Sequence, residues 1–212
     1  MASEKILILE APWSDSIEET QATRDIYASA ETLLRVGPQP IRIIQRPLVS
    51  TTYRSDIKKF VDLECNQKGL NIIIFSAHGS HTLIGGNRHR RELEAFDGDV
   101  NISQDIQRLK KKLRRTIIIL DSCKVGEDIA SFRRASGSLA AIGFTEDADW
   151  VDSSVFILGL LLRFKKDDIF HLKGVPKRTA ETDSRPQKTL RKMLRGPYQS
   201  FKEHLGVKYS FA

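Results

Sequence analysis

The chain contains 212 residues, of which 40% are hydrophobic and 29% are charged, a composition typical of globular proteins. This length accommodates one domain, or one domain with a modest extension, and excludes two full-sized domains. No apolar run is long enough to cross a bilayer, and the N-terminus lacks the apolar region and cleavage site of a signal peptide. Two cysteines cannot build a disulfide framework or supply four metal thiolates. The sequence therefore predicts a cytoplasmic protein with no membrane partner and no metal site.

The formal net charge of +7 is unevenly distributed along the chain. Residues 163–212 hold 13 Lys or Arg and 5 Asp or Glu, whereas residues 1–162 hold 21 basic and 22 acidic residues. The basic excess therefore belongs to the last quarter, which could bind an acidic partner or nucleic acid. Because no aromatic interleaving or binding motif accompanies this charge, a solvated basic helix face is favoured, and a nucleic-acid partner is not expected.

Five short apolar runs, rich in Ile, Leu and Phe, are typical of parallel strands that are covered on both faces. In chain order, the predicted elements are a strand at 5–10, a helix at 16–36, a strand at 41–48, a helix at 55–66, a strand at 71–77, a helix at 103–115, a strand at 116–121, a helix at 126–134, a strand at 138–144, a helix at 153–164 and a helix at 187–204. Long loops are expected at 80–99 and 173–187, and Gly196-Pro197 should break the last helix. This alternation predicts an α/β sandwich with a mostly parallel sheet.

Two residues that could do covalent chemistry follow predicted strands. In an open α/β sheet, ligands bind beyond the carboxyl ends of the strands; His78 follows the third strand and Cys123 the fourth. An imidazole beside a thiol suits acyl transfer, because the thiolate attacks a carbonyl and the imidazole handles the proton. Gly79 would let a backbone N–H approach a developing oxyanion. Taken singly, His78 could be a solvated residue and Cys123 a small core residue.

The residues around these two positions resemble a known family. Ser76-Ala77-His78-Gly79, and Asp121-Ser122-Cys123 with Gly126, resemble the paired motifs of the caspase-like (clan CD) cysteine peptidases, which include caspases, metacaspases and CHAT-domain proteases. The pattern is most similar to the metacaspase-like one. The resemblance implies a caspase-like three-layer αβα sandwich over residues 1–165, followed by a basic extension, residues 166–212, packed on the same domain.

The resemblance also implies roles for individual residues. Cys123 would be the nucleophile and His78 the general acid/base, and the backbone N–H groups of Gly79 and Cys123 would form the oxyanion hole. Asp121 would line the pocket for the residue before the scissile bond (P1). A carboxylate there favours cleavage after Arg or Lys. The alternative is that Asp121 caps the turn into the next helix.

Residues after the fifth strand would form one wall of the substrate cleft. Glu146, Asp147 and Asp149 could attract a basic P1 side chain and its basic neighbours, and Trp150 could supply an apolar wall. Their alternatives are an ordinary polar loop with an Asp at a helix N-terminus and a tryptophan in the core.

Three further expectations concern single residues. The pair Arg90-Arg91, taken as an exposed loop, and the segment near Arg133 are candidate self-cleavage sites. Cys65 is expected in the core side of an amphipathic helix. Lys124 either lowers the pKa of the Cys123 thiol or points into water.

The favoured function is a cysteine endopeptidase that acts on protein or peptide substrates after Arg or Lys and needs no cofactor. By analogy with short prokaryotic relatives, it could be an effector in defence or cell death, and an activating protein partner or a homodimer remains open. The main alternative is a catalytically silent caspase-like module that binds a protein or nucleic acid through its basic C-terminal segment. A flavodoxin-like or nucleotide-hydrolysing protein is disfavoured, because no phosphate-binding loop follows the first strand.

Overall fold

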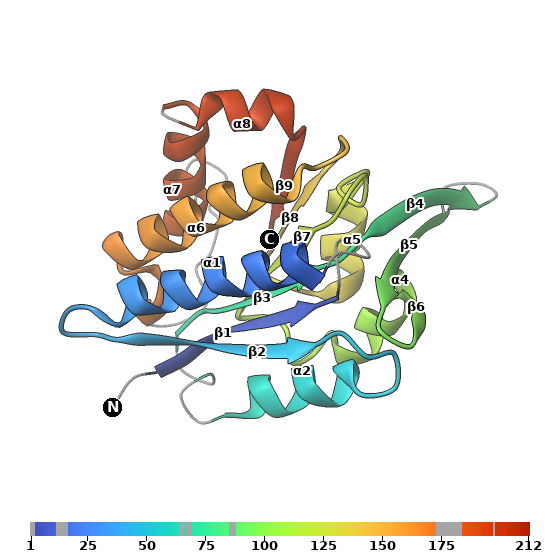
Figure 1. Cartoon of the computed structure of the whole chain (residues 1–212), viewed down its shortest axis with the longest axis horizontal. Coiled ribbons are helices and arrows are strands. Elements are labelled where there is room, and N and C mark those ends of the chain that lie inside the picture. Colours follow the sequence, from blue (N-terminus) through green and yellow to red (C-terminus); the bar gives the residue numbers. More distant parts are fainter. Residues whose placement is uncertain are drawn as a thin grey trace.

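A computed structural model describes residues 3–11, 17–63, 66, 69–84, 88–172, 184–196 and 198–212. Its centre is a six-stranded sheet with the strand order β2-β1-β3-β7-β8-β9 (Figure 1). The strands are β1 (Ser3–Glu10), β2 (Ile41–Pro47), β3 (Asn71–Ser76), β7 (Thr116–Asp121), β8 (Ala140–Phe144) and β9 (Val207–Phe211). The first five run parallel, and β9 runs antiparallel to β8. The prediction of a mostly parallel α/β sheet is confirmed.

Helices cover both faces of this sheet. Neighbouring strand residues point to opposite sides, and both sides carry apolar side chains that must be buried. Ile6 and Ile8 of β1 belong to one apolar cluster, whereas Leu7 and Leu9 belong to the other. The first cluster packs under α1 (Ile17–Arg35) and α6 (Trp150–Lys166), which lie side by side in Figure 1. The second packs under α2 (Tyr53–Asp62), α4 (Ile102–Asp105), η1 (Ile106–Leu109) and α5 (Ile129–Ser136). The molecule is therefore a three-layer sandwich.

The expected loop at 80–99 is instead a small antiparallel sheet, so that prediction was wrong. It consists of β4 (Gly79–Ile84), β5 (Arg88–Ala95) and β6 (Gly98–Asn101). Among the described side chains of β5, Arg91, Leu93 and Ala95 are buried, and Arg91 is charged. The usual hydrophobic alternation of a half-buried strand is therefore missing from the sequence. The helix expected at 103–115 is also shorter, since η1 ends at Leu109.

The C-terminal segment contributes to the same core and the same sheet. α7 (Arg185–Leu194) packs on α6 through Leu190, Met193 and Leu194. The predicted break after it is confirmed, because α8 (Gln199–His204) begins as a separate helix and leads into β9. A short turn, η2 (Ile169–His171), follows α6. None of the described helices is both long and apolar enough to span a membrane.

Candidate active site

The polar residues that end three neighbouring strands lie in one row at the carboxyl edge of the sheet. Glu10 of β1 is paired in register with Ser76 of β3, and Ser76 is paired with Asp121 of β7. By strand alternation their side chains point to the same face, toward α1 and α6. Apolar strands thus end in a polar row where the sheet meets α1.

The two loops that leave this edge are tied to each other. The Ala77 N–H donates to the Asp121 carbonyl at 3.2 Å, and the Ser122 hydroxyl donates to the Ala77 carbonyl at 2.6 Å. His78 and Cys123 each stand two residues beyond the paired residues Ser76 and Asp121. The chain therefore brings an imidazole and a thiol to neighbouring strand ends at the same level.

Two glycines allow the backbone to pass closely through this region. A Cβ on Gly79 would lie 2.8 Å from the Ser122 Cβ and 2.9 Å from a Val125 methyl. A Cβ on Gly126 would lie 2.6 Å from the Gly143 carbonyl carbon, and the Gly126 N–H donates to Phe144 at 2.7 Å. Both glycines of the paired motifs are therefore required by packing around the Cys123 loop.

A buried arginine holds the loop that follows Cys123. Arg91 is 1% exposed, and its Nε donates to the Val125 carbonyl at 2.8 Å. A second guanidinium nitrogen donates to the Glu127 carbonyl and a third lies 3.4 Å from the Ser103 hydroxyl. Burial lowers the pKa of Arg91 to about 10, so the group stays cationic at neutral pH. Several fixed hydrogen bonds compensate for its burial and define the path of residues 125–127.

This geometry corrects the expectation of an exposed Arg90-Arg91 loop. Both residues lie in β5, and only Arg90 is exposed. Arg133 lies half-buried in α5, within the helix that the sequence predicted. Cleavage after Arg91 or Arg133 would require these elements to unfold.

The Cys123 thiol is partly buried under the loop that precedes α6. Its Sγ lies 3.7 Å from the Ala148 carbonyl, which can accept a hydrogen bond from the thiol. Burial raises the pKa of Cys123, and the carboxylates of Asp147 and Asp121 act in the same direction. Lys124 opposes this shift, but its Nζ is paired with Asp147 at 2.8 Å. Lys124 therefore acts in the expected direction, but burial has the larger effect and the net pKa of the thiol is raised.

The four predicted cleft residues after β8 have identifiable structural roles or exposed positions. Asp149 caps α6, accepting hydrogen bonds from the N–H groups of Val151 at 2.8 Å and Asp152 at 3.2 Å. Glu146 is exposed, and Trp150 is half-buried at the first turn of α6. Asp149 thus performs the capping role that was its alternative, while the loop as a whole borders Cys123.

Asp121 is entirely buried on the α1–α6 face. Its Oδ2 accepts hydrogen bonds from Ser76 at 2.8 Å and Tyr27 at 3.1 Å, so it does not cap the following turn. Burial raises its pKa to about 6, although the Ser153, Ser76 and Tyr27 hydroxyls favour the charged form. Within the described residues no Lys, Arg or His forms an ion pair with it. Asp121 is a buried carboxylate without a cation, located two residues before Cys123.

Glu10 was not among the predicted site residues, although its position at the end of a strand indicates one. Glu10 ends the first apolar run, as Asp121 ends the fourth, and it is 5% exposed. Arg24 of α1 donates to its Oε1 at 2.6 Å. Burial raises the pKa of Glu10 while Arg24 opposes the shift. The rule that strand ends carry function would have selected it.

A second acidic region, which the sequence did not indicate, adjoins His78. The exposed imidazole borders a small hollow of about 170 Å³ that is also lined by Glu92, Glu94 and Asp99. These carboxylates come from β5 and β6, which the sequence did not predict as strands. Among the residues in the described ranges, no group of three His, Cys, Asp or Glu side chains is arranged to hold a metal ion. Cys65 lies outside those ranges.

No protein-family model matches the sequence, and no curated protein matches it significantly. Among solved structures, the chain is similar to a secreted C11 cysteine protease from Bacteroides thetaiotaomicron, solved with an irreversible peptide inhibitor, and to the Drosophila initiator caspase Dronc. Both have a TM-score of 0.50, with identities of 12% and 9% over 94% and 97% of this chain. The chain spans 60% of the C11 protease chain and 78% of the Dronc chain. At these identities the similarity shows the fold, and the chain has the caspase-like α/β fold that its motifs implied.

Proposed function

We propose that the chain is a cysteine peptidase in which Cys123 is the nucleophile and His78 the general acid/base. The observation that carries this proposal is the register of β3 and β7, which brings both side chains to neighbouring strand ends. The similarity in fold to a C11 protease and a caspase supports the same reaction class.

In the proposed reaction, His78 takes the proton of the Cys123 thiol, and the resulting thiolate attacks the carbonyl carbon of a peptide bond. The C–N bond then breaks, His78 gives a proton to the leaving amine, and a thioester remains. Water, deprotonated by His78, attacks the thioester and releases the new carboxylate and the thiol. The N–H groups of Gly79 and Cys123 would stabilise the oxyanion.

Before that reaction, a substrate would have to displace the Ala148 carbonyl. The Cys123 thiol faces this carbonyl in the present conformation, and burial raises its pKa. Outward movement of residues 145–149 would expose the thiol and open a path toward Asp121. An activating partner that moves this loop would therefore increase activity.

Specificity for Arg or Lys at P1 is supported by the buried carboxylate of Asp121. An ionised group without a cation is costly in the interior, and a substrate guanidinium would supply the missing partner. The acidic hollow beside His78 would add to the attraction for basic peptides. A cytoplasmic location, a homodimer and a role in defence stay predictions.

The test compares fluorogenic peptides that carry Arg, Lys, Asp, Asn or Leu at P1, using wild type and Cys123→Ala. We expect turnover after Arg and Lys that falls by at least about a thousandfold in Cys123→Ala. Equal thermal unfolding midpoints would show that the variant is folded. Turnover only after Asp would contradict the role of Asp121, and undiminished turnover in Cys123→Ala would contradict the nucleophile.

A peptide warhead provides a second readout if no peptide is cut. Covalent labelling of Cys123, located by mass spectrometry, would support a competent thiol that awaits an activator. Absence of both turnover and labelling would favour the catalytically silent module.

A further inference from the structure

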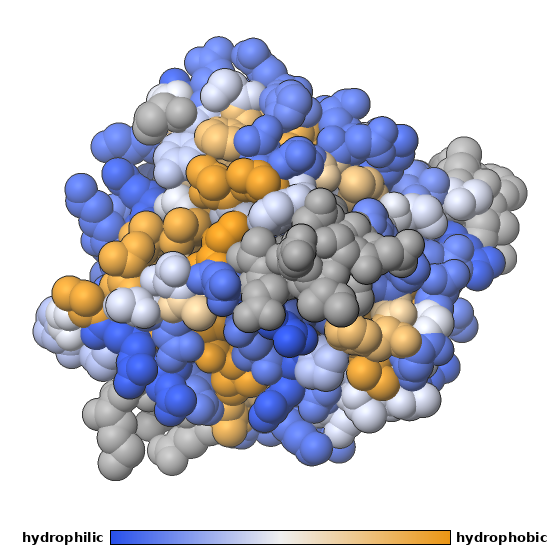
Figure 2. All heavy atoms as spheres, in the orientation of Figure 1, coloured by the Kyte–Doolittle hydropathy of each residue, from blue (hydrophilic) through white to orange (hydrophobic). Residues whose placement is uncertain are grey.

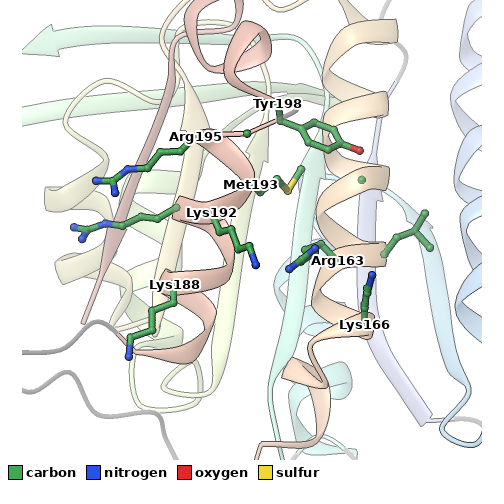
Figure 3. A pocket seen from close by; sticks show the side chains of 11 residues that line it. Arg163, Lys166, Lys188, Lys192, Met193, Arg195 and Tyr198 are labelled. Atoms are coloured by element: carbon green, nitrogen blue, oxygen red, sulfur yellow. The ribbon is translucent and has the colours of Figure 1, made fainter.

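A large basic groove lies between α6 and α7, toward the opposite end of α6 from Cys123 (Figure 3). Its volume is about 780 Å³, within the range of small-molecule sites. Six of its lining residues are cationic: Arg163, Lys166, Lys188, Arg191, Lys192 and Arg195. The groove therefore contains much of the basic excess of the last quarter of the chain.

Four of these six cations have no ion-pair partner among the described residues. Arg163 is paired with Asp167 at 3.2 Å, and the same carboxylate oxygen accepts a hydrogen bond from Thr189 at 2.7 Å. Lys166, Lys188, Lys192 and Arg195 form no ion pair with any residue that the structure describes. Like charges held this close repel each other, and an anion bound between them would relieve the repulsion.

The side chains of two helices converge on the groove. Figure 3 shows Arg163 and Lys166 of α6 facing Lys192 of α7 across the gap, while Lys188 and Arg195 extend along the outer side of α7. A planar guanidinium and two ammonium groups around one space suit the several oxygens of a phosphate chain.

One part of the groove is apolar. Leu162 and Met193 line it together with Tyr198 and Gly159. The Tyr198 hydroxyl would lie 2.1 Å from a Cβ on Gly159, so the tyrosine packs directly on α6. Its ring also packs edge-on against Phe156, with centroids 6.3 Å apart. A rigid apolar wall next to clustered cations fits a ligand with both a ring and a polyanionic part.

We propose that this groove binds a nucleoside polyphosphate. The phosphates would contact Arg163, Lys166 and Lys192, and the nucleoside would pack against Leu162, Met193 and Tyr198. A nucleic acid duplex would instead need a broad basic surface, whereas these cations surround a cavity of small-molecule size. The inference concerns a site separate from Cys123 and does not depend on the proposed peptidase activity.

The experiment measures binding of ATP to the full chain by calorimetry. The test variant combines Lys166→Glu with Lys192→Glu. The control combines Lys58→Glu with Lys59→Glu, which makes the same charge change at exposed positions of α2 on the other face. We expect the test variant to bind ATP at least about tenfold more weakly and the control to stay within about twofold of wild type. Lys166→Gln with Lys192→Gln replaces the test variant if the Glu substitutions impair folding.

Three probes separate this proposal from its competitors. Inorganic triphosphate should bind more weakly than ATP, because it cannot use the apolar wall. Equal affinity for triphosphate, or tighter binding of an acidic peptide or a single-stranded oligonucleotide, would overturn the nucleotide proposal. It would also be overturned by no ATP binding at millimolar concentration, or by an equal loss of affinity in the control.

Discussion

The two ends of α6 lie in opposite electrostatic environments. Its first turn is capped by Asp149 beside the acidic loop that covers Cys123, whereas its last turns carry Arg163 and Lys166 at the basic groove. Both ends agree with the helix dipole, which favours anions at the N-terminus and cations at the C-terminus. The net charge of +7 therefore conceals two local regions of opposite sign, one suited to a basic peptide and one to an anion.

The two regions also differ in accessibility. Asp121 has no exposed surface, and the Ala148 carbonyl lies over the Cys123 thiol. The groove instead opens to solvent between α6 and α7 (Figure 3). Apolar surface gathers along α1 and α6 in Figure 2. The exposed large apolar side chains include Leu33 of α1 and Val151 and Val155 of α6. In the present conformation an anion would have direct access to the groove, whereas a peptide would first have to displace the loop over Cys123. The contrast predicts that substitutions at each end of α6 affect different functions.

Among the substitutions that test this contrast, the largest effect is expected from Asp121→Asn, which removes a charge from its acidic side. Asn keeps an acceptor for Tyr27 and Ser76 but cannot neutralise a substrate cation. We expect kcat/KM for Arg peptides to fall about a hundredfold and that for Leu peptides to change less than about threefold. An equal loss for both peptides would indicate a structural role for Asp121.

The same substitution should change stability in a pH-dependent way. The pKa of Asp121 is raised to about 6 in the folded protein, against about 4 in an unfolded chain. The stability that the protonated carboxyl contributes is therefore present below about pH 4 and is lost as the pH rises through about 6. Urea unfolding should show Asp121→Asn more stable than wild type by about 2 kcal/mol at pH 8 and by much less at pH 4. A constant difference across this range would contradict the raised pKa.

A smaller effect is expected for Arg91→Met. This variant tests whether Arg91 supports the site by holding residues 125–127 in place rather than through its charge. The variant loses hydrogen bonds to the Val125 and Glu127 carbonyls, so residues 125–127 would no longer be held. We expect kcat to fall about tenfold with KM nearly unchanged, and the unfolding free energy to fall by about 2 kcal/mol.

The control for Arg91→Met is Arg90→Met on the exposed side of the same strand, which should leave kcat unchanged. Arg91→Lys should recover part of the loss, because an ammonium can donate to one of the two carbonyls. A kcat that is unchanged in Arg91→Met would show that this loop does not position Cys123.

The smallest effect is expected for Lys124, the cation next to Cys123. Its charge is paired with Asp147 on the surface, and its φ of 57° suits glycine. Lys124→Gly should therefore change kcat/KM by less than about twofold. The pH profile of Cys123 alkylation by iodoacetamide should stay nearly unchanged. A clear shift of that pH profile would show that Lys124 does tune the thiol.

The strands that build the site were predictable because their signal is local. Residues 116–121 form β7 as expected, since a continuous run of Thr, Ile and Leu is stable only when both faces are covered. The placement of His78 and Cys123 after neighbouring strands follows from that pattern and from the rule for open α/β sheets. β5 was missed because Arg91 replaces an apolar residue on its buried face.

The sequence by itself thus determined the mostly parallel sheet, its covering helices and the strand ends that carry His78, Cys123 and Asp121. Only the tertiary structure decided that Asp121 is buried with no cation paired to it among the described residues, that Arg91 faces inward, and that Val207–Phe211 forms β9 in the central sheet. It also gathered the cations of α6 and α7 around one groove. The reason is physical: local patterns follow from backbone geometry and side-chain alternation, whereas burial and charge partners depend on residues far apart in the chain.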